Sequence, residues 1–136
     1  MGSFIATIFA FASLWVPLPV LDVETCPPYT QGYVSDDTIH VCPDLTVPRD
    51  EVVNHEIIHL IQNNIGGTIL PPEMLDELIK DYMTDEEILL VVTVYANSDY
   101  IDEEFEARLL SDLPSGFIML MYRLSEGYAS TSPSNS

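Results

Sequence analysis

Basic residues are the scarcest feature of this 136-residue sequence. Four Lys and Arg residues stand against 22 Asp and Glu, which gives a formal net charge of −18. A surface of this charge repels phosphate groups, so binding to nucleic acid or to an anionic membrane surface is disfavoured. The acidity keeps a protein soluble, and it also suits a saline or extracellular setting or a basic partner.

Cysteine is scarce too, with Cys26 and Cys42 alone. Neither belongs to a CxxC pair, so a cysteine-based zinc site is not expected. The two flank a short segment rich in proline, glycine and tyrosine. They could close it as a disulfide, and two free thiols are equally compatible because the compartment is unknown.

Apolar runs long enough to cross a bilayer are also missing. Residues 4–12 are apolar and end in an AFA triplet that resembles a signal-peptide cleavage site, but no positive charge precedes them. We therefore expect residues 1–20 to be an apolar segment that packs onto the body or docks into a protein assembly. An extracellular or particle-associated location fits an acidic protein with such a segment better than a cytoplasmic location does.

The residues that are present predict one α+β domain over residues 1–128, followed by a flexible tail at 129–136. Apolar residues form 47% of the chain, enough for a core. Four early prolines favour extended segments, and residues 33–42 are typical of a β-hairpin with a turn at 35–37. From residue 51 the pattern is helical, with helices expected at 50–64, 71–82, 84–97, 98–113 and 115–128.

Capping residues set the expected helix ends. Asp50 or Thr46 can cap the first helix, and Gly66 can stop it. Thr84 is a good cap for the third, because Glu87 follows three residues later. The centre of that third helix is so apolar that we expect the helix to be mostly buried. Its run of β-branched residues is also compatible with a β-strand.

The stretch EVVNHEIIHLIQ contains two of the three histidines. His55 and His59 are four residues apart, so on a helix they lie about 40° apart on one face and can point at one metal ion. Glu56 lies beside them, where a base for a metal-bound water belongs. The alternative is a chance HxxxH on an ordinary amphipathic helix.

The other positions of this helix agree with a polar site face. Gln62 and Asn63 lie on the side of the histidines, and the apolar residues cover the opposite side: Val53, Ile57, Ile58, Leu60 and Ile61.

Zinc needs a third protein ligand. His40 is one candidate, on the polar face of a predicted strand. No histidine follows His59 and the position six residues later is Ile65, which excludes HExxHxxGxxH. The remaining candidates are carboxylates in the acidic run at residues 102–110.

HExxH followed at a distance by E-x-x-A resembles the glutamate zincins, or gluzincins. The EFEA sequence is similar to the third-ligand motif of that family. The resemblance covers these two short motifs. It implies a zincin-like fold, in which a small N-terminal β-region precedes a helical body with an active-site helix and a glutamate helix.

Carried over to this chain, the resemblance implies Zn²⁺ bound by His55, His59 and Glu104, with Glu56 as the catalytic base. Ala107 would be the small residue that lets the two helices approach. Glu103 and Glu106 remain open as alternative ligands, because an acid-rich helix offers several registers. The hairpin would line the cleft and pair with an extended peptide substrate.

One position departs from the family pattern. Arg108 stands where an acid or amide usually accepts a hydrogen bond from a ligand histidine, and a guanidinium cannot accept one. The group that orients the histidine would then be Asp112 or a backbone carbonyl, and Arg108 could pair with Glu104 instead.

The resemblance implies a zinc-dependent metallopeptidase acting on a peptide or protein substrate. A developing oxyanion would need a second donor, with Tyr95, Tyr100, Tyr122, His40 and Arg108 as candidates. Two alternatives stay open. One is a non-catalytic zincin serving as a binding or assembly subunit, and the other is a secreted, disulfide-closed interaction domain without metal.

Overall fold

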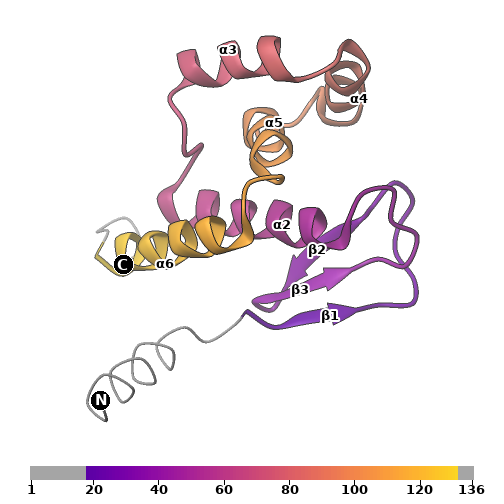
Figure 1. The fold of residues 1–136 in the computed structure, drawn as a ribbon, viewed down its shortest axis with the longest axis vertical. Coiled ribbons are helices and arrows are strands. Elements are labelled where there is room, and N and C mark those ends of the chain that lie inside the picture. The colour runs from indigo at the N-terminus through magenta and orange to yellow at the C-terminus, as the bar shows by residue number, and fades with distance from the viewer. Residues whose placement is uncertain (1–17, 132–136) are drawn as a thin grey trace, which may run out of the picture.

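Three short strands precede five helices in the part of the chain that the structure, a computed structural model, describes, residues 18–131 (Figure 1). The strands are β1 (Val20–Asp22), β2 (Gly32–Ser35) and β3 (Thr38–Val41). The helices are α2 (Arg49–Ile65), α3 (Pro72–Tyr82), α4 (Asp85–Tyr95), α5 (Ile101–Leu110) and α6 (Ser115–Thr131). The order of a small sheet followed by a helical body confirms the predicted α+β class.

The two predicted terminal segments fall largely outside the described residues. Residues 1–17 of the apolar segment and residues 132–136 of the tail are among those not described. Helix α6 continues to Thr131, three residues into the predicted tail. None of the helices between residues 18 and 131 is long and apolar enough to cross a membrane.

The sheet has the strand order β1-β3-β2, with β1 parallel and β2 antiparallel to the central β3. The predicted hairpin is confirmed, and its turn is the pair Asp36 and Asp37. Both have positive φ, 53° and 59°, as a two-residue type I′ turn requires. Along β3, Ile39 and Val41 are buried in the core while His40 faces the other side of the sheet.

Helix α2 lies against the sheet and is the element around which the rest packs (Figure 1). Helix α6 runs beside it, and α5 leads from it toward α3 and α4. The main core joins residues of the sheet, α2, α5 and α6. These are Ile39, Val41, Val52, Ile57, Ile58, Ile61, Ala107 and Ile118.

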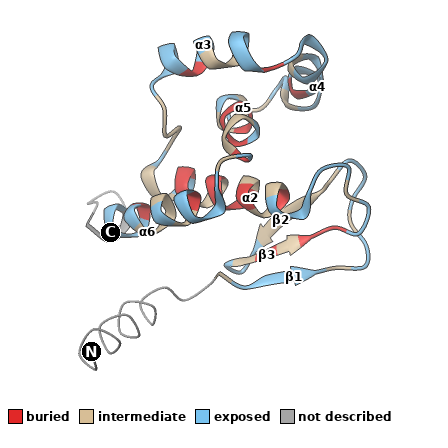
Figure 2. Ribbon diagram, viewed as in Figure 1, coloured by how far each residue is buried: buried red, intermediate tan, exposed pale blue. Residues whose placement is uncertain are grey.

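A second, smaller core lies under α3 and α4 and consists of Met83, Val91 and Phe105. Phe105 and Ala107 belong to different cores although both are on α5. Helix α5 is therefore the connection between the two halves, and Figure 2 shows its buried residues together with those of α2.

The prediction that the third helix is mostly buried was wrong. Residues 85–95 form a helix, α4, but Val91 is its one buried residue, and Leu89, Leu90, Val92 and Val94 are exposed. The reason is tertiary, since α4 packs on α5 along one side and is exposed elsewhere in the described structure (Figure 2). Hydropathy alone does not reveal how many neighbours a helix has.

The capping predictions had mixed outcomes. Thr84 and Glu87 form the predicted capping box. The prediction for α2 was wrong, because Pro48 occupies its N-cap without a side-chain bond and Asp50 lies within the first turn. Thr46 is engaged elsewhere, as its backbone N–H and hydroxyl both bond the side chain of Gln31.

Candidate metal centre

The face of α2 that is turned away from the main core carries the two histidines. The helix has 17 residues and ends at Gly66, whose φ of 83° is the left-handed C-cap that glycine adopts readily. Ile57, Ile58 and Ile61 are buried on the core side. This packing fixes the rotation of α2 and leaves His55 and His59 partly exposed, one turn apart.

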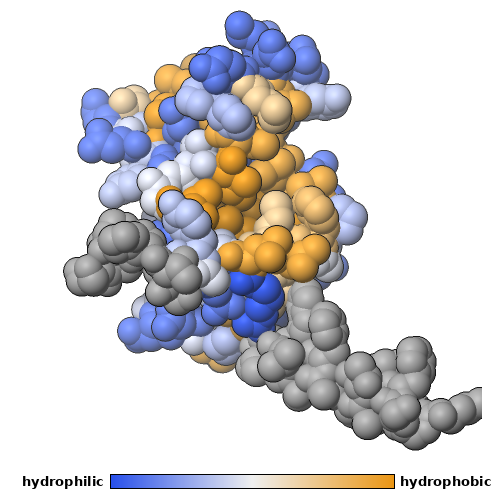
Figure 3. Space-filling view, turned by 90° about the vertical axis from the view of Figure 1, so that its left-hand side faces the viewer, coloured by the Kyte–Doolittle hydropathy of each residue, from blue (hydrophilic) through white to orange (hydrophobic). Residues whose placement is uncertain are grey.

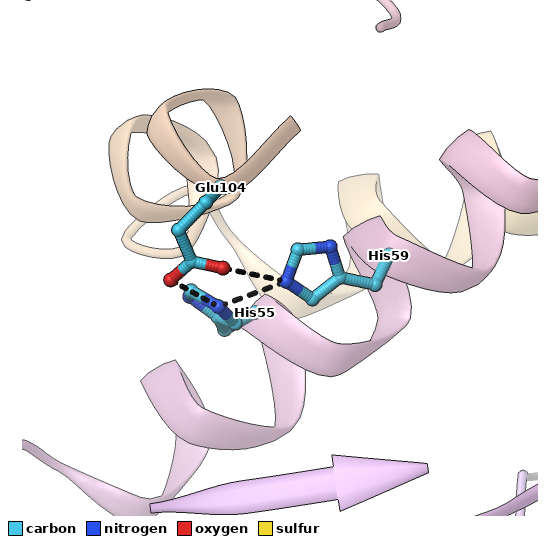
Figure 4. A group of neighbouring side chains, drawn as sticks. All are labelled: His55, His59 and Glu104. Carbon is cyan, nitrogen blue, oxygen red and sulfur yellow. Dashed lines mark hydrogen bonds and ion pairs between the residues drawn. The ribbon is translucent and has the colours of Figure 1, made fainter. Parts of the chain in front are cut away.

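Glu104 of α5 reaches both histidines (Figure 4). Its Oε1 lies 3.3 Å from Nε2 of His55, and its Oε2 lies 3.1 Å from Nε2 of His59. The two Nε2 atoms are 3.1 Å apart. Three side chains from two helices thus bring their polar atoms to one point, although His59 and Glu104 are 45 positions apart in the chain.

The electrostatics of this group favour opposite charges. Burial would raise the pKa of Glu104, but hydrogen bonds and positive charge from His55 and His59 hold it well below its usual range. Burial would lower the pKa of His59, but its bonds to Glu104 and Gln62 and the negative charge of Glu104 raise it. Glu104 is therefore held ionised beside the two imidazoles, and a cation that took the place of the imidazolium proton would meet a negatively charged oxygen there.

The donor set fits a transition metal such as zinc. Two imidazoles and one carboxylate are the ligands of a well-known class of zinc site that keeps a fourth position open. Tetrahedral bonds of about 2.1 Å place neighbouring donor atoms about 3.4 Å apart. The observed separations of 3.1–3.3 Å come close to this, and the three residues form a group that could hold an ion.

The other candidate ligands lie elsewhere. Glu106 is fully buried and bonds the backbone N–H groups of Ile69 and Leu70. Glu103 meets α2 through its backbone carbonyl, which accepts a bond from Gln62. His40 stacks on Tyr33 with ring centroids 4.6 Å apart. None of these three belongs to the His55, His59 and Glu104 group.

Glu56 lies next to the histidines in a hollow of about 360 Å³ between α2 and the hairpin. The lining includes Val34, Asp36 and Asp37 of the hairpin and His59 of α2. Burial raises the pKa of Glu56, as does the charge of Glu104, and the charges of His55 and His59 oppose this shift without cancelling it. A carboxylate with a raised pKa beside open space is suited to accept and return a proton.

The candidates for a second hydrogen-bond donor to an oxyanion differ in their distance from Glu104 and in their exposure. Arg108 donates from Nε to Oε1 of Glu104 at 3.0 Å, which confirms the predicted pair along α5. Tyr95 is close as well, since its pKa is raised by burial and then by the charge of Glu104. Tyr100 is 70% exposed, and Tyr122 packs against the main core.

Two contributions to the site were missed by the sequence interpretation. Gln62, and not Asp112, bonds Nδ1 of His59, at 2.8 Å, and Asp112 is exposed. Gly32 lets β2 approach α2, because a Cβ there would lie 2.7 Å from Cγ1 of Val52. A glutamine three residues after the second histidine was the available signal for the first contribution. A lone glycine at the start of a strand is too common to reveal the second.

Comparison with protein-family models, with curated proteins and with solved structures finds no match for this chain. The geometry of the site and the short motifs in the sequence are therefore the features that bear on function.

Proposed function

We propose that this protein is a zinc-dependent metallopeptidase with a zincin-like arrangement of helices. One observation carries the proposal: the side chains of His55, His59 and Glu104 converge from α2 and α5, and Glu56 lies beside them in a hollow. In this assignment α2 is the active-site helix and α5 the glutamate helix. The complete burial of Ala107 in the core shared with α2 supports this close approach of α5.

The residues divide into holding and reacting groups. His55, His59 and Glu104 would hold Zn²⁺, which when bound acidifies a water molecule and polarises a carbonyl group. Glu56 accepts a proton from water in the hollow and returns it to the leaving amine. Arg108 holds Oε1 of Glu104 and so restricts the carboxylate to one orientation.

The substrate we propose is an extended peptide lying between the hairpin and α2. The hollow beside Glu56 is bounded by β2 and the turn that follows it. Among residues 18–131, strand β2 is an edge of the sheet, so within that range one side of its backbone is not paired with another strand and can bind an extended chain.

The test combines metal analysis with one isosteric variant. Purified protein is assayed for bound zinc by mass spectrometry and for cleavage of a fluorogenic peptide library. We expect one zinc per chain, cleavage by the wild type, and full zinc content without cleavage in Glu56→Gln. Asp50→Asn, at an exposed acid on the same helix, is the control and should retain both. Absence of zinc would overturn the proposal, as would cleavage that survives Glu56→Gln.

A second candidate function, an assembly subunit without catalysis, is favoured by exposed apolar helices. Helix α6 has four large apolar residues that are each at least 43% exposed: Phe117, Leu120, Leu124 and Tyr128. Their spacing places them on one side of the helix. Apolar side chains also gather over the middle of the face drawn in Figure 3, below a hydrophilic upper edge. Exposed patches of this kind mark interaction surfaces.

This candidate predicts zinc binding without cleavage that depends on Glu56, together with self-association or partner binding. Light scattering after size-exclusion chromatography, on wild type and on Leu120→Glu/Leu124→Glu, distinguishes the two. A monomer at all concentrations, with cleavage dependent on Glu56, would reject self-assembly in favour of the peptidase. The Cys26–Cys42 disulfide supports an oxidising compartment for either function.

A further inference from the structure

Gln62 has two distinct sets of neighbours. Its side chain is buried, with 4% of the residue exposed. Its Nε2 donates to the backbone carbonyl of Glu103 at 2.9 Å and to Oε1 of Glu106 at 3.1 Å, while its Oε1 lies 2.8 Å from Nδ1 of His59. A backbone carbonyl can only accept hydrogen bonds, so the amide nitrogen of Gln62 must face α5 and its oxygen must face His59.

The orientation of this amide determines the proton on His59. An amide oxygen can only accept, so Nδ1 of His59 carries the hydrogen. Nε2 is the atom that lies beside His55 and Glu104. In the metal-free protein the carboxylate of Glu104 also accepts a hydrogen bond there, but a ring that bound a metal through Nε2 would keep its remaining hydrogen on Nδ1, facing Gln62. Gln62 thus selects the tautomer that can bind a metal at this point.

Glu106 holds Gln62 and also a segment of backbone. Its carboxylate is fully buried. Oε1 accepts from Gln62 and from the N–H of Ile69 at 2.7 Å, and Oε2 accepts from the N–H of Leu70 at 2.7 Å. Burying a carboxylate is costly unless it is hydrogen-bonded, and these three bonds account for its position. They join the connection between α2 and α3 to the histidine.

We propose that Gln62 and Glu106 are positioning residues, which orient His59 for metal binding and couple metal occupancy to the backbone at Ile69 and Leu70. The metal part of this inference rests on the proposed function. The chain of contacts runs from His59 through Gln62 and Glu106 to the two backbone N–H groups. A bound metal that limits the motion of the His59 ring should therefore also limit the motion of the backbone that connects α2 to α3.

The first test measures metal affinity in two matched variants. Gln62→Met keeps the side-chain size and removes the amide. Asn54→Leu does the same to a second buried amide of α2, which bonds the carbonyls of Ser111 and Leu113 and does not contact a histidine. Zinc affinity is measured by competition with a chelator, and metal-free stability by urea unfolding.

We expect Gln62→Met to weaken zinc binding by about 10- to 100-fold, and Asn54→Leu to leave it within about twofold while lowering stability at least as much. Unchanged zinc affinity in Gln62→Met would overturn the proposal. Equal weakening of zinc binding in both variants would overturn it as well, because the effect would then reflect stability alone.

The second test does not need the metal. The ¹⁵N shifts of the His59 ring, recorded by NMR in metal-free Glu104→Ala protein at a pH where the ring is neutral, identify its tautomer without a carboxylate at Nε2. We expect the Nδ1–H form in Glu104→Ala and in Glu104→Ala/Asn54→Leu, and a mixture of tautomers in Glu104→Ala/Gln62→Met. A mixture in Glu104→Ala would overturn the positioning role. Because this readout is independent of zinc, it separates failure of the relay from failure of the proposed metal site.

The third test follows the two backbone N–H groups. Hydrogen exchange at Ile69 and Leu70 should slow when zinc is added to wild type, and should not respond in Gln62→Met at saturating zinc. Glu106→Gln should speed exchange at one or both amides, because an amide group has one acceptor atom in place of two. Zinc that protects residues 55–59 in wild type without slowing exchange at Ile69 and Leu70 would overturn the coupling.

Discussion

Glu104 and His59 shift each other's ionisation in opposite directions. Bonds and charge from the histidines lower the pKa of Glu104 against the effect of burial, and bonds to Glu104 and Gln62 raise the pKa of His59 against the same effect. In metal-free protein the two are therefore an ion pair over a limited pH range. The same shifts govern how protons compete with a metal.

The stability that this pair contributes should depend on pH in both directions. Because the pKa of Glu104 is lowered, its contribution is present above the ordinary value of 4.5 and is lost as the pH falls through the lower folded-state value. Because the pKa of His59 is raised, its contribution is present below the ordinary value of 6.5 and is lost as the pH rises through the higher folded-state value.

We therefore predict that metal-free wild type exceeds Glu104→Gln in thermal stability most between about pH 4.5 and 6.5. Calorimetry on both proteins from pH 3 to 9 measures the difference. A difference that stays constant across this range would contradict the prediction.

Zinc binding should release protons because the metal requires a neutral imidazole. Since the pKa of His59 is raised, more protons leave at pH 6 than at pH 8, and zinc affinity is weaker at pH 6. Titration calorimetry in two buffers of different ionisation enthalpy counts the protons. Equal affinity and equal proton release at the two values would rule this out.

At the scale of elements, the close approach of β2 and α2 depends on Gly32. A Cβ at this position would lie 2.7 Å from Cγ1 of Val52 and 3.0 Å from the carbonyl oxygen of His40. Neither the strand nor the helix can move freely, because both belong to the main core. The hollow that contains Glu56 is therefore shaped by the absence of a side chain.

We predict that Gly32→Ala lowers the free energy of unfolding by about 1–3 kcal/mol and reduces peptide cleavage more than zinc binding, because it displaces β2 from Glu56. Urea unfolding, zinc titration and the peptide assay measure the three effects. Gly116→Ala has open space for its Cβ and should change stability by less than about 1 kcal/mol. Equal effects of the two substitutions would be inconsistent with the steric explanation.

The stability of helix α4 depends on its N-terminal capping box more than on buried side chains. Thr84 accepts a bond from the backbone N–H of Glu87 at 3.1 Å, and Val91 is the one buried residue of the helix. We predict that Thr84→Ala costs about 1 kcal/mol, measured by urea unfolding. The same substitution at Thr93, in the exposed interior of α4, should cost less, since alanine favours helix there. A cost at Thr93 as large as that at Thr84 would contradict the role of the cap.

At the scale of the whole molecule, the described chain is a small sheet and a helical layer joined by α2 and α5, with a disulfide on the sheet. Cys26 and Cys42 are 16 positions apart and are bonded, so of the two alternatives open from the sequence the structure has the disulfide. The bond ties the segment between β1 and β2 to the end of β3, next to the strands that bound the hollow.

We predict that Cys26→Ser/Cys42→Ser lowers the free energy of unfolding by about 3 kcal/mol, the chain-entropy value for a loop of this size. Denaturation of the wild type with and without a reductant should show the same difference. If reduction leaves the unfolding midpoint of the wild type unchanged, the disulfide does not stabilise the folded protein.

Local pattern was enough to predict most of the elements. The i, i+4 spacing of His55 and His59, the glycine after α2 and the capping box of α4 involve neighbours within one or two turns, so they can be read from the chain directly. The exposure of α4 could not be predicted in this way, because burial depends on which elements pack together. The N-cap of α2 was missed because Thr46 bonds Gln31, a residue 15 positions away.

Helical geometry is local, so the order of residues along the chain was sufficient to place two imidazoles on one face of a helix with a carboxylate beside them. Long-range packing selects which acid joins them. Each residue adds about 100° around a helix, so Glu103, Glu104 and Glu106 point in three different directions from α5. The packing of Phe105 and Ala107 into the two cores sets the rotation of that helix. This rotation turns Glu104 toward the histidines and Glu106 toward Gln62, a choice that depends on contacts between residues far apart in the chain.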